Sequence, residues 1–190
     1  MDSKLNLSKY YDEYDKNICP NWLFSKLEKA YTQIDNVRMK KGRLIFAGNG
    51  ASAAIASHAA LDFTKQAKIQ SLAFHDAALI TAYANDYENH TWLREIFKSY
   101  VEKNDLVIFI SVSGESPNIV KAASHLNENN IKTICFTGKS ENNSLSKICG
   151  INFWVDSSAY NIVEGIHMIW VTTLIDMFIG KSEYSVSPKK

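Results

Sequence analysis

The sequence predicts an α/β fold, a doubly wound parallel sheet with helices on both of its faces. Two observations predict this fold class. Five short runs of four or five residues are rich in branched or aromatic side chains and are apolar on both faces, as in strands that are buried in a parallel sheet. Segments with apolar residues at helical spacing alternate with these runs along the chain, which is the pattern of consecutive strand–helix–strand units.

The elements follow in order within a single domain over residues 1–190. An N-terminal helical segment (1–41), amphipathic near 21–40, precedes a core over 42–156, and a helix near 160–180 closes the chain. The expected strands are RLIFA (43–47), SLAF (71–74), LVIFI (106–110), KTICF (132–136) and INFWV (151–155). The expected helices between them cover 51–67, 91–103 and 116–130, the last ending at an Asn-Asn pair.

Composition limits the function classes. A net charge of +1 over 190 residues gives no general attraction for nucleic acid or for an anionic membrane surface, so we expect neither as a partner. The N-terminal residues form no apolar signal segment, and three cysteines lack metal-ligand spacing, so we expect reduced thiols and a cytoplasmic protein. The stretch 162–180 is long enough to cross a bilayer but carries Glu164, His167 and Asp176, which favours a buried or intersubunit helix.

The loop after the first strand is suited to binding an anion. It reads GNGASA from Gly48, and Gly50 allows close approach of the backbone and a positive φ angle. The helix that begins near Ser52 then points its free N–H groups, with their partial positive charge, out of this loop.

The loop after the third strand repeats this design with hydroxyl groups. SVSGESPN supplies Ser111, Ser113 and Ser116, and Pro117 suits the first position of a helix. A simpler interpretation is that Ser116 only caps that helix. Three serines around one glycine at the end of a central strand favour a phosphate site instead, because hydroxyls and backbone amides hold an anion without Lys or Arg.

The first loop also allows a nucleotide-binding interpretation. GNGASA also fits the dinucleotide pattern G-x-G-x-x-A, with Asp76 as a candidate ribose ligand. That interpretation leaves the serine loop, His58 and Asp62 without a role, and the Gly-Lys-Ser/Thr ending of a Walker loop is absent. We therefore expect no nucleotide cofactor.

Five motifs together resemble a known family. GNGASA, SHAALDF on the same helix, ANDY at 84–87, SVSGES and the pair Glu164-x-x-His167 are similar to sugar isomerase (SIS) domains, more narrowly to bacterial phosphoheptose isomerases, over roughly residues 20–180. The resemblance implies a five-stranded parallel sheet in an αβα sandwich, and homotetramers with sites at subunit interfaces.

The resemblance also implies roles for individual residues. Those with implied substrate or phosphate contacts are Asn49, Gly50, Ser52, Asp86, Ser111, Ser113 and Ser116. The family's first-helix histidine and carboxylate match His58 and Asp62, and its C-terminal Gln and His fall on Glu164 and Thr172. Asp62 replaces a glutamate and Thr172 replaces the catalytic histidine, so the acid–base set departs from the family pattern.

Ketose–aldose isomerisation needs a base for a carbon-bound proton and a group that moves protons between two oxygens. Asp62 or Glu164 are candidates for the base, and His58 or His167 for the acid. The same four residues form i,i+4 and i,i+3 pairs, which also suits zinc or another divalent metal. His167 has an equally good interpretation as a buried, hydrogen-bonded histidine, and Asp86 as a turn residue.

The sequence thus predicts an isomerase of a phosphorylated ketose, sedoheptulose 7-phosphate first among the candidates, that makes a heptose 7-phosphate for surface polysaccharide through an enediol. The alternative is a non-catalytic SIS module that senses a sugar phosphate or binds a protein. The retained His58, Asp62 and Glu164 favour the enzyme.

Overall fold

The computed structural model describes residues 5–88 and 90–184. Five parallel strands form one sheet in the order β2-β1-β3-β4-β5. They are β1 (Leu44–Gly48), β2 (Ser71–Ala73), β3 (Leu106–Ser111), β4 (Lys132–Thr137) and β5 (Ile151–Trp154). All five expected strands are present, each within one residue of the expected limits.

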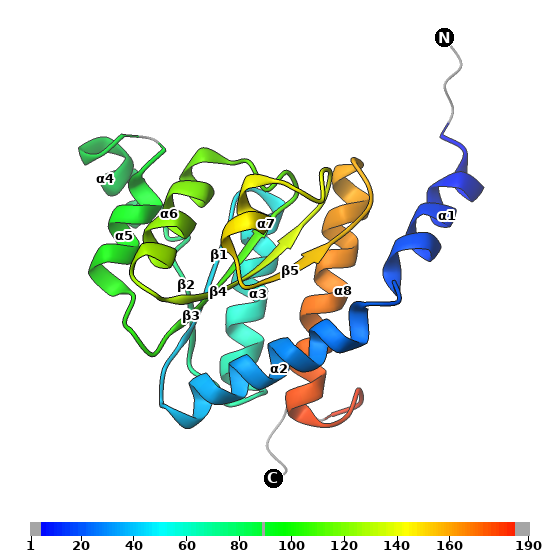
Figure 1. The fold of residues 1–190 in the computed structure, drawn as a ribbon, viewed down its shortest axis with the longest axis horizontal. Helices are drawn as coiled ribbons and strands as arrows, with labels where there is room; N and C mark the ends of the chain where they lie inside the picture. Colours follow the sequence, from blue (N-terminus) through cyan, green and yellow to red (C-terminus); the bar gives the residue numbers. More distant parts are fainter. Residues whose placement is uncertain (1–4, 89, 185–190) are drawn as a thin grey trace.

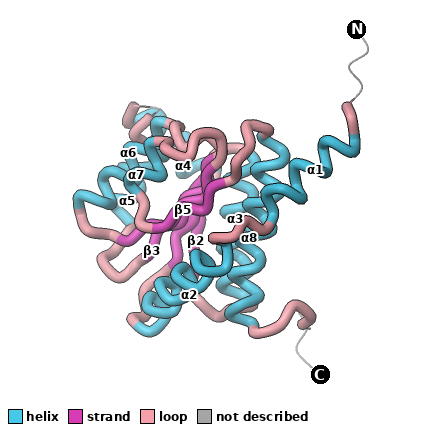
Figure 2. The backbone as a smooth tube through the Cα atoms, turned by 45° about the vertical axis from the view of Figure 1, so that its right-hand side comes forward, coloured by secondary structure: helices cyan, strands magenta, loops and turns pink. Residues whose placement is uncertain are grey.

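Helices cover both faces of this sheet (Figures 1 and 2). On one face lie α1 (Leu7–Ile18), α2 (Leu23–Met39), α3 (Ala51–Lys65) and α8 (Tyr160–Ile179). On the other face lie α4 (Ala77–Asp86), α5 (Trp92–Tyr100), α6 (Pro117–Glu128) and α7 (Ser144–Ile148). The structure therefore confirms the three-layer α/β sandwich.

The apolar runs explain the two cores. Along β3, Ile108 and Ile110 point into the core on the α3 and α8 side, while Val107 and Phe109 point into the core under α5 and α6. This alternation follows from the two-residue repeat of a strand. Because helices cover both faces, both sets of side chains are buried, which is why β3 is apolar at every position from Leu106 to Ile110.

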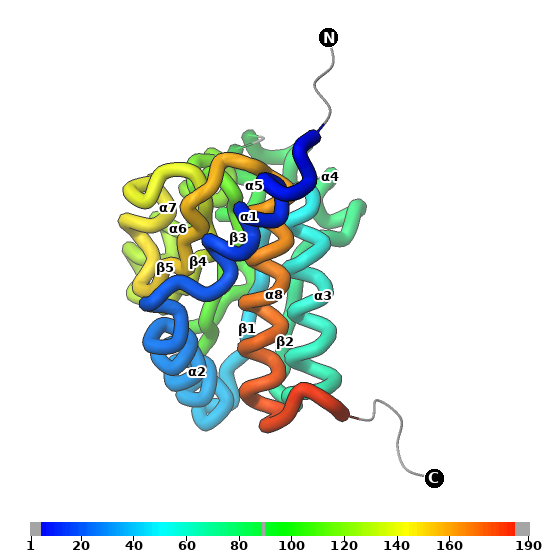
Figure 3. The backbone as a smooth tube through the Cα atoms, turned by 90° about the vertical axis from the view of Figure 1, so that its right-hand side faces the viewer, coloured from blue at the N-terminus to red at the C-terminus, as the bar shows by residue number. Residues whose placement is uncertain are grey.

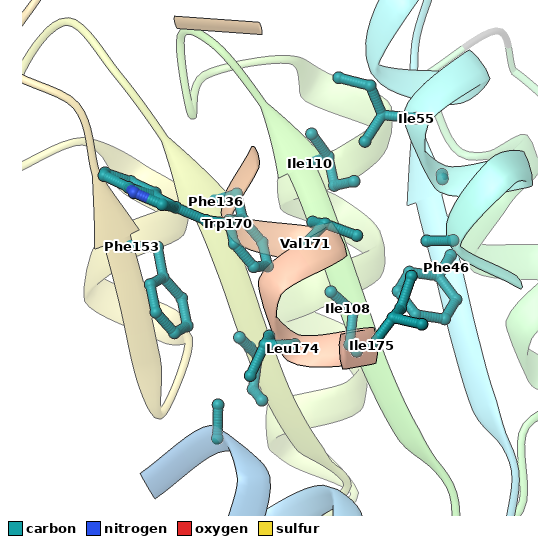
Figure 4. Packing of buried hydrophobic residues seen from close by; sticks show 14 of the residues in the cluster. Phe46, Ile55, Ile108, Ile110, Phe136, Phe153, Trp170, Val171, Leu174 and Ile175 are labelled. Carbon is teal, nitrogen blue, oxygen red and sulfur yellow. The ribbon is translucent and has the colours of Figure 1, made fainter. Parts of the chain in front are cut away.

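Helix α8 is the long apolar segment near the end of the chain. Among the described residues it is the one helix whose length and hydropathy would suit a membrane span, and 44% of its most apolar window is buried. Eight of its residues are buried, and Figure 4 shows Trp170, Val171, Leu174 and Ile175 packed on Phe136, Phe153 and Ile108 of the sheet. Packing in the core accounts for its apolar character.

Two helices were not anticipated. Asp76, considered above as a ribose ligand, instead caps α4: its Oδ1 accepts hydrogen bonds from the N–H groups of Ala78 and Leu79 at 3.0 and 3.1 Å. Asn143 caps the short α7 in the same way, accepting from the N–H of Ser146 at 2.8 Å. The carboxylate of Asp76 is therefore occupied as a helix cap.

Candidate active site

The two loops that the sequence predicts to bind an anion lie side by side where the order of strands reverses. Residues Gly48 and Ile110 are paired at the carboxyl ends of β1 and β3, so the loop before α3 and the loop before α6 start next to each other. In sheets of order 2-1-3-4-5 this switch point is where ligands bind. Gly50 and Gly114 have φ angles of +55° and +64°, which explains glycine in both loops.

A small cavity of about 90 Å³ opens between these loops. It is lined by Asn49, Ser52, Ile110, Ser111, Val112, Ser113, Ser116, Tyr160 and Glu164. Pockets that enclose a whole small molecule measure about 300–1,000 Å³, so within one chain this cavity can take a group the size of a phosphoryl but not an entire sugar phosphate. The structure thus brings together all four serines assigned to phosphate.

The serine hydroxyls keep hydrogen-bonding capacity for a ligand. Ser116 occupies the N-cap position of α6 but makes no capping hydrogen bond with its side chain, so the simpler interpretation of this residue is wrong. Ser113 Oγ accepts one hydrogen bond, from the N–H of Glu115 at 3.1 Å, and keeps its own O–H for another partner. Ser52 and Ser111 are 3% and 5% exposed, which places their hydroxyls at the base of the loops.

Side-chain hydrogen bonds hold the two loops in place, and the sequence analysis missed them. Asn49 and Asn118 exchange hydrogen bonds between their side-chain amides, each at 3.0 Å. On the other side, the carboxylate of Glu115 accepts from the N–H of Ser144 at 2.8 Å and from its hydroxyl at 2.6 Å. These bonds lower the pKa of Glu115. Asparagine and glutamate in loops are too common to have indicated either pairing.

Three side chains around the cavity mouth add polar and charged character. Burial raises the pKa of Glu164, which faces the cavity from α8. Tyr160, at the start of the same helix, receives a hydrogen bond on its hydroxyl from Lys139 Nζ at 3.3 Å. Lys139 is exposed and is a cation near the mouth that the sequence analysis did not single out.

The side chains of His58 and Asp62 lie against each other on α3, with 3.3 Å between Nε2 and Oδ2. Neither lines the cavity. His58 follows Ser52 by six residues, or about 9 Å along the helix axis. A second carboxyl group, that of Asp176, lies on the neighbouring helix α8. Burial, and then the charge of Asp62, raise the pKa of Asp176. The pair and the cavity therefore lie on the same side of the sheet, separated along α3.

His167 lies in the core between α8 and the sheet and does not line the cavity. Its ring is fully buried beside Phe136 and Trp170, and Nε2 lies 3.1 Å from the carbonyl oxygen of Thr137 on β4. Burial lowers its pKa to about 4. A ring with 0% exposure has no access to a ligand in this subunit, and the arrangement matches the interpretation of a buried histidine.

The four residues that the sequence offers as metal ligands are not assembled within one subunit. No three His, Cys, Asp or Glu side chains of residues 5–88 and 90–184 come close enough together to hold a metal ion. His58 and Asp62 are adjacent, Glu164 faces the serines and His167 faces the sheet. Because these donors do not converge, they do not fit a metal within the single chain.

Two further positions complete the comparison with the sequence. Asp86 is exposed at the end of α4, on the opposite face of the sheet from α3, and it does not line the cavity. The hydroxyl of Thr172 donates into its own helix, to the carbonyl oxygens of Met168 and Ile169 at 3.0 Å each. The residue at the position of the expected histidine thus makes a local contact within α8.

Comparison with known proteins gives a consistent result. The family model described as SIS domain matches residues 17–138. A phosphoheptose isomerase of Nitratidesulfovibrio vulgaris is 30% identical over 162 residues, covering 80% of this chain and 77% of the relative. A probable phosphoheptose isomerase of Thermoplasma volcanium is 32% identical over 149 residues, covering 75% of each. The solved structure of a phosphoheptose isomerase from Francisella tularensis superposes with a TM-score of 0.80 at 23% identity, covering 94% of this chain and all of that one.

Proposed function

The chain belongs to the SIS domain family, among the phosphoheptose isomerases, and from this premise we propose that it isomerises sedoheptulose 7-phosphate to a heptose 7-phosphate. The product would supply surface polysaccharide synthesis. The relatives carry isomerase names, which favours the enzyme over a non-catalytic sensor or protein-binding module.

One observation carries the proposal: four serines and the backbone of two loops surround a cavity of phosphoryl size at the switch point of the sheet. The phosphoryl group binds there and anchors one end of the substrate. The sugar extends out of the cavity, since about 90 Å³ leaves no room for it. Substrate binding then depends on hydroxyl and amide donors rather than on arginine or lysine at the base of the site.

The chemistry is proton transfer through an enediol. A carboxylate, Asp62 or Glu164, takes a proton from C1 of the ketose while the carbonyl oxygen at C2 gains one. The base, whose proton exchanges with solvent while the enediol is bound, then delivers a proton to C2, and the hydroxyl at C1 loses its proton to form the aldehyde. His58, whose Nε2 lies 3.3 Å from Oδ2 of Asp62, is the candidate acid that moves protons between the oxygens. We do not extend this role to His167, because its ring is enclosed in the core.

No step is assigned to a metal, because the donor residues of one chain do not converge. His58 and Asp62 are two adjacent donors to which a second subunit could add. We further propose a cytoplasmic homo-oligomer, a tetramer by analogy with the family resemblance. Neighbouring copies would complete the wall around the sugar.

The experiment is NMR of sedoheptulose 7-phosphate with the purified protein in heavy water. We expect a heptose 7-phosphate that carries deuterium at C2. Of the variants Asp62→Asn and Glu164→Gln, the one that removes the base should still bind the substrate and lose exchange by about 100-fold or more, the range for loss of a general base. Tight binding of the ketose without any exchange would overturn the enzyme proposal and favour a sensor.

A further inference from the structure

The paired amides of Asn49 and Asn118 join the two phosphate loops across the switch point. Asn49 follows β1, Asn118 is the second residue of α6, and 69 positions separate them in the sequence. Each Nδ2 donates to the other residue's Oδ1 at 3.0 Å. Any relative movement of the loops has to break both hydrogen bonds.

The pairing also sets how each amide is oriented. A side-chain amide has two N–H donors and one carbonyl oxygen, and the reciprocal pair uses one donor and the oxygen of each residue. Asn49 lines the cavity, so its second N–H remains for a ligand. Asn118 is 8% exposed, and turning either amide over would leave buried polar atoms unpaired.

The serine loop is fixed on its far side as well. Glu115 accepts two hydrogen bonds from Ser144 at the start of α7, and the N–H of Leu145 donates to the carbonyl oxygen of Gly114 at 3.0 Å. The loop before α3 has no comparable support from α7. Beyond the pairing of β1 with β3, which ends at Gly48 and Ile110, the Asn49–Asn118 pair is the side-chain connection between the braced serine loop and its neighbour.

We propose that Asn118 is a positioning residue that fixes Asn49 and joins the two loops into one pre-formed site for a phosphoryl group. The pre-formed geometry spares the ligand the cost of ordering the loops. The inference rests on the proposed function for the class of ligand, the phosphoryl group of a sugar phosphate. Asn118 itself acts through Asn49, without touching the ligand.

The first test measures binding of inorganic phosphate and of sedoheptulose 7-phosphate by calorimetry to the wild type, Asn118→Ala, Asn49→Ala and the double variant. We expect Asn118→Ala to weaken both ligands about tenfold, the effect of one to two net hydrogen bonds. The double variant should bind no more weakly than Asn49→Ala, because Asn118 acts only through Asn49. Additive losses, or wild-type affinity in Asn118→Ala, would overturn the inference.

The second test uses no ligand. Amide hydrogen exchange should rise in both 48–52 and 111–116 in Asn118→Ala and in the nearly isosteric Asn118→Asp, which cannot donate the return bond to Asn49. The control is Asn17→Ala, another buried asparagine whose amide donates to Glu13 and whose oxygen accepts from the N–H of Asp156. It should lower stability without changing exchange in either loop.

The two tests separate this inference from the proposed function. If the wild type binds phosphate but turns over no ketose, the isomerase proposal fails and the positioning role stands. If the wild type binds neither ligand, the phosphate site itself is wrong and both fail. Exchange in Asn118→Ala that stays at the wild-type level in the 48–52 loop would reject the positioning role even for an active isomerase.

Discussion

Glu164 places a carboxyl group in the same small cavity as the serine hydroxyls. An ionised carboxylate there opposes a phosphoryl dianion, while a protonated one can donate a hydrogen bond to it. Burial raises the pKa of Glu164, which extends the neutral form to higher pH than for an exposed glutamate. At this position the residue links affinity for the substrate to pH.

We expect the Glu164→Gln variant to bind sedoheptulose 7-phosphate about fivefold more tightly than the wild type at pH 8, from the loss of one partly screened repulsion. The advantage should shrink as the pH falls through the raised pKa, because the wild type then becomes neutral too. Calorimetry at several pH values checks this, and the ratio of the two affinities cancels the titration of the phosphate itself.

Glu128→Gln, exposed at the far end of α6, is the matched control and should follow the wild type at every pH. Identical pH profiles for wild type and Glu164→Gln would show that Glu164 does not meet the phosphoryl group.

His167 affects stability rather than chemistry. Its pKa is lowered to about 4 because a charged ring has no access to water in the core. Above pH 6.5 both folded and unfolded states hold it neutral, so its full contribution to stability is present. As the pH falls from 6.5 to about 4, only the unfolded state takes up the proton, and the free energy of unfolding drops by about 3 kcal/mol in total.

The measurement is urea unfolding of the wild type and of His167→Gln at pH 7.5, 6 and 5. The variant should be less stable than the wild type at pH 7.5. Below pH 6 the free energy of unfolding of the wild type should fall by about 1 kcal/mol more than that of the variant for each pH unit. His75 and His125, whose pKa values are also lowered by burial, are present in both proteins and cancel in the comparison. Parallel pH slopes for the two proteins would contradict the buried, neutral ring.

For single residues, the sequence indicates which side chains are candidates for the site better than it indicates which side chains contact each other. Ser111, Ser113 and Ser116 were identified because hydroxyls cluster at the end of an apolar run, which is a local signal. Asn118 was missed because its partner is 69 residues away. The role of His167 was left open because helical spacing shows which face a side chain occupies, not whether that face is covered.

Elements were predictable where one physical signal dominated. The strands were found because burial on both faces requires continuous apolar residues. Helix α4 was missed because its residues are apolar without periodicity and none is buried, so they gave no amphipathic pattern. Helix α7 has only five residues and makes little periodic signal at all.

The contact between α3 and α8 brings two acidic groups together. Burial, and then Asp62, raise the pKa of Asp176, so the folded state binds its proton more tightly than the unfolded state does. Stability is therefore highest where Asp176 is protonated and declines as the pH rises from its ordinary pKa to the raised one. Above that range the helix pair retains an unfavourable charge.

We expect Asp176→Asn to raise the melting temperature by about 2 °C at pH 8, and the gain to disappear near pH 4. Scanning calorimetry across this range makes the comparison. The control is Asp156→Asn, which removes an exposed ion pair with Lys16 and should leave the melting temperature almost unchanged. A variant that melts below the wild type at pH 8 would show that the Asp176 carboxylate makes a favourable contact in the folded protein.

The whole molecule combines a complete core with an incomplete site. Both faces of the sheet are covered and the loops at the switch point are in place, yet the cavity holds only about 90 Å³. Beside it, α3 and α8 lie together on one side of the molecule (Figure 3). Both helices expose large apolar side chains. Leu61 on α3 is 57% exposed and Ile169 on α8 is 40% exposed.

The small cavity and the exposed apolar side chains have a common explanation if other copies of the chain pack on α3 and α8. The apolar side chains would then be buried at an interface, and the neighbouring copy would extend the wall around the sugar. We expect the wild type to be an oligomer and the double variant Leu61→Asp, Ile169→Asp to dissociate into smaller species. Light scattering after size-exclusion chromatography measures this. Phe24→Asp on α2, where the side chain is 67% exposed, is the control for an apolar residue on another helix and should leave the oligomer intact.

The dissociated variant should still bind inorganic phosphate in its cavity. It should bind sedoheptulose 7-phosphate no more tightly than inorganic phosphate, because the sugar would have lost its contacts with the neighbouring subunit. A monomeric wild type with full activity would overturn this account of the site.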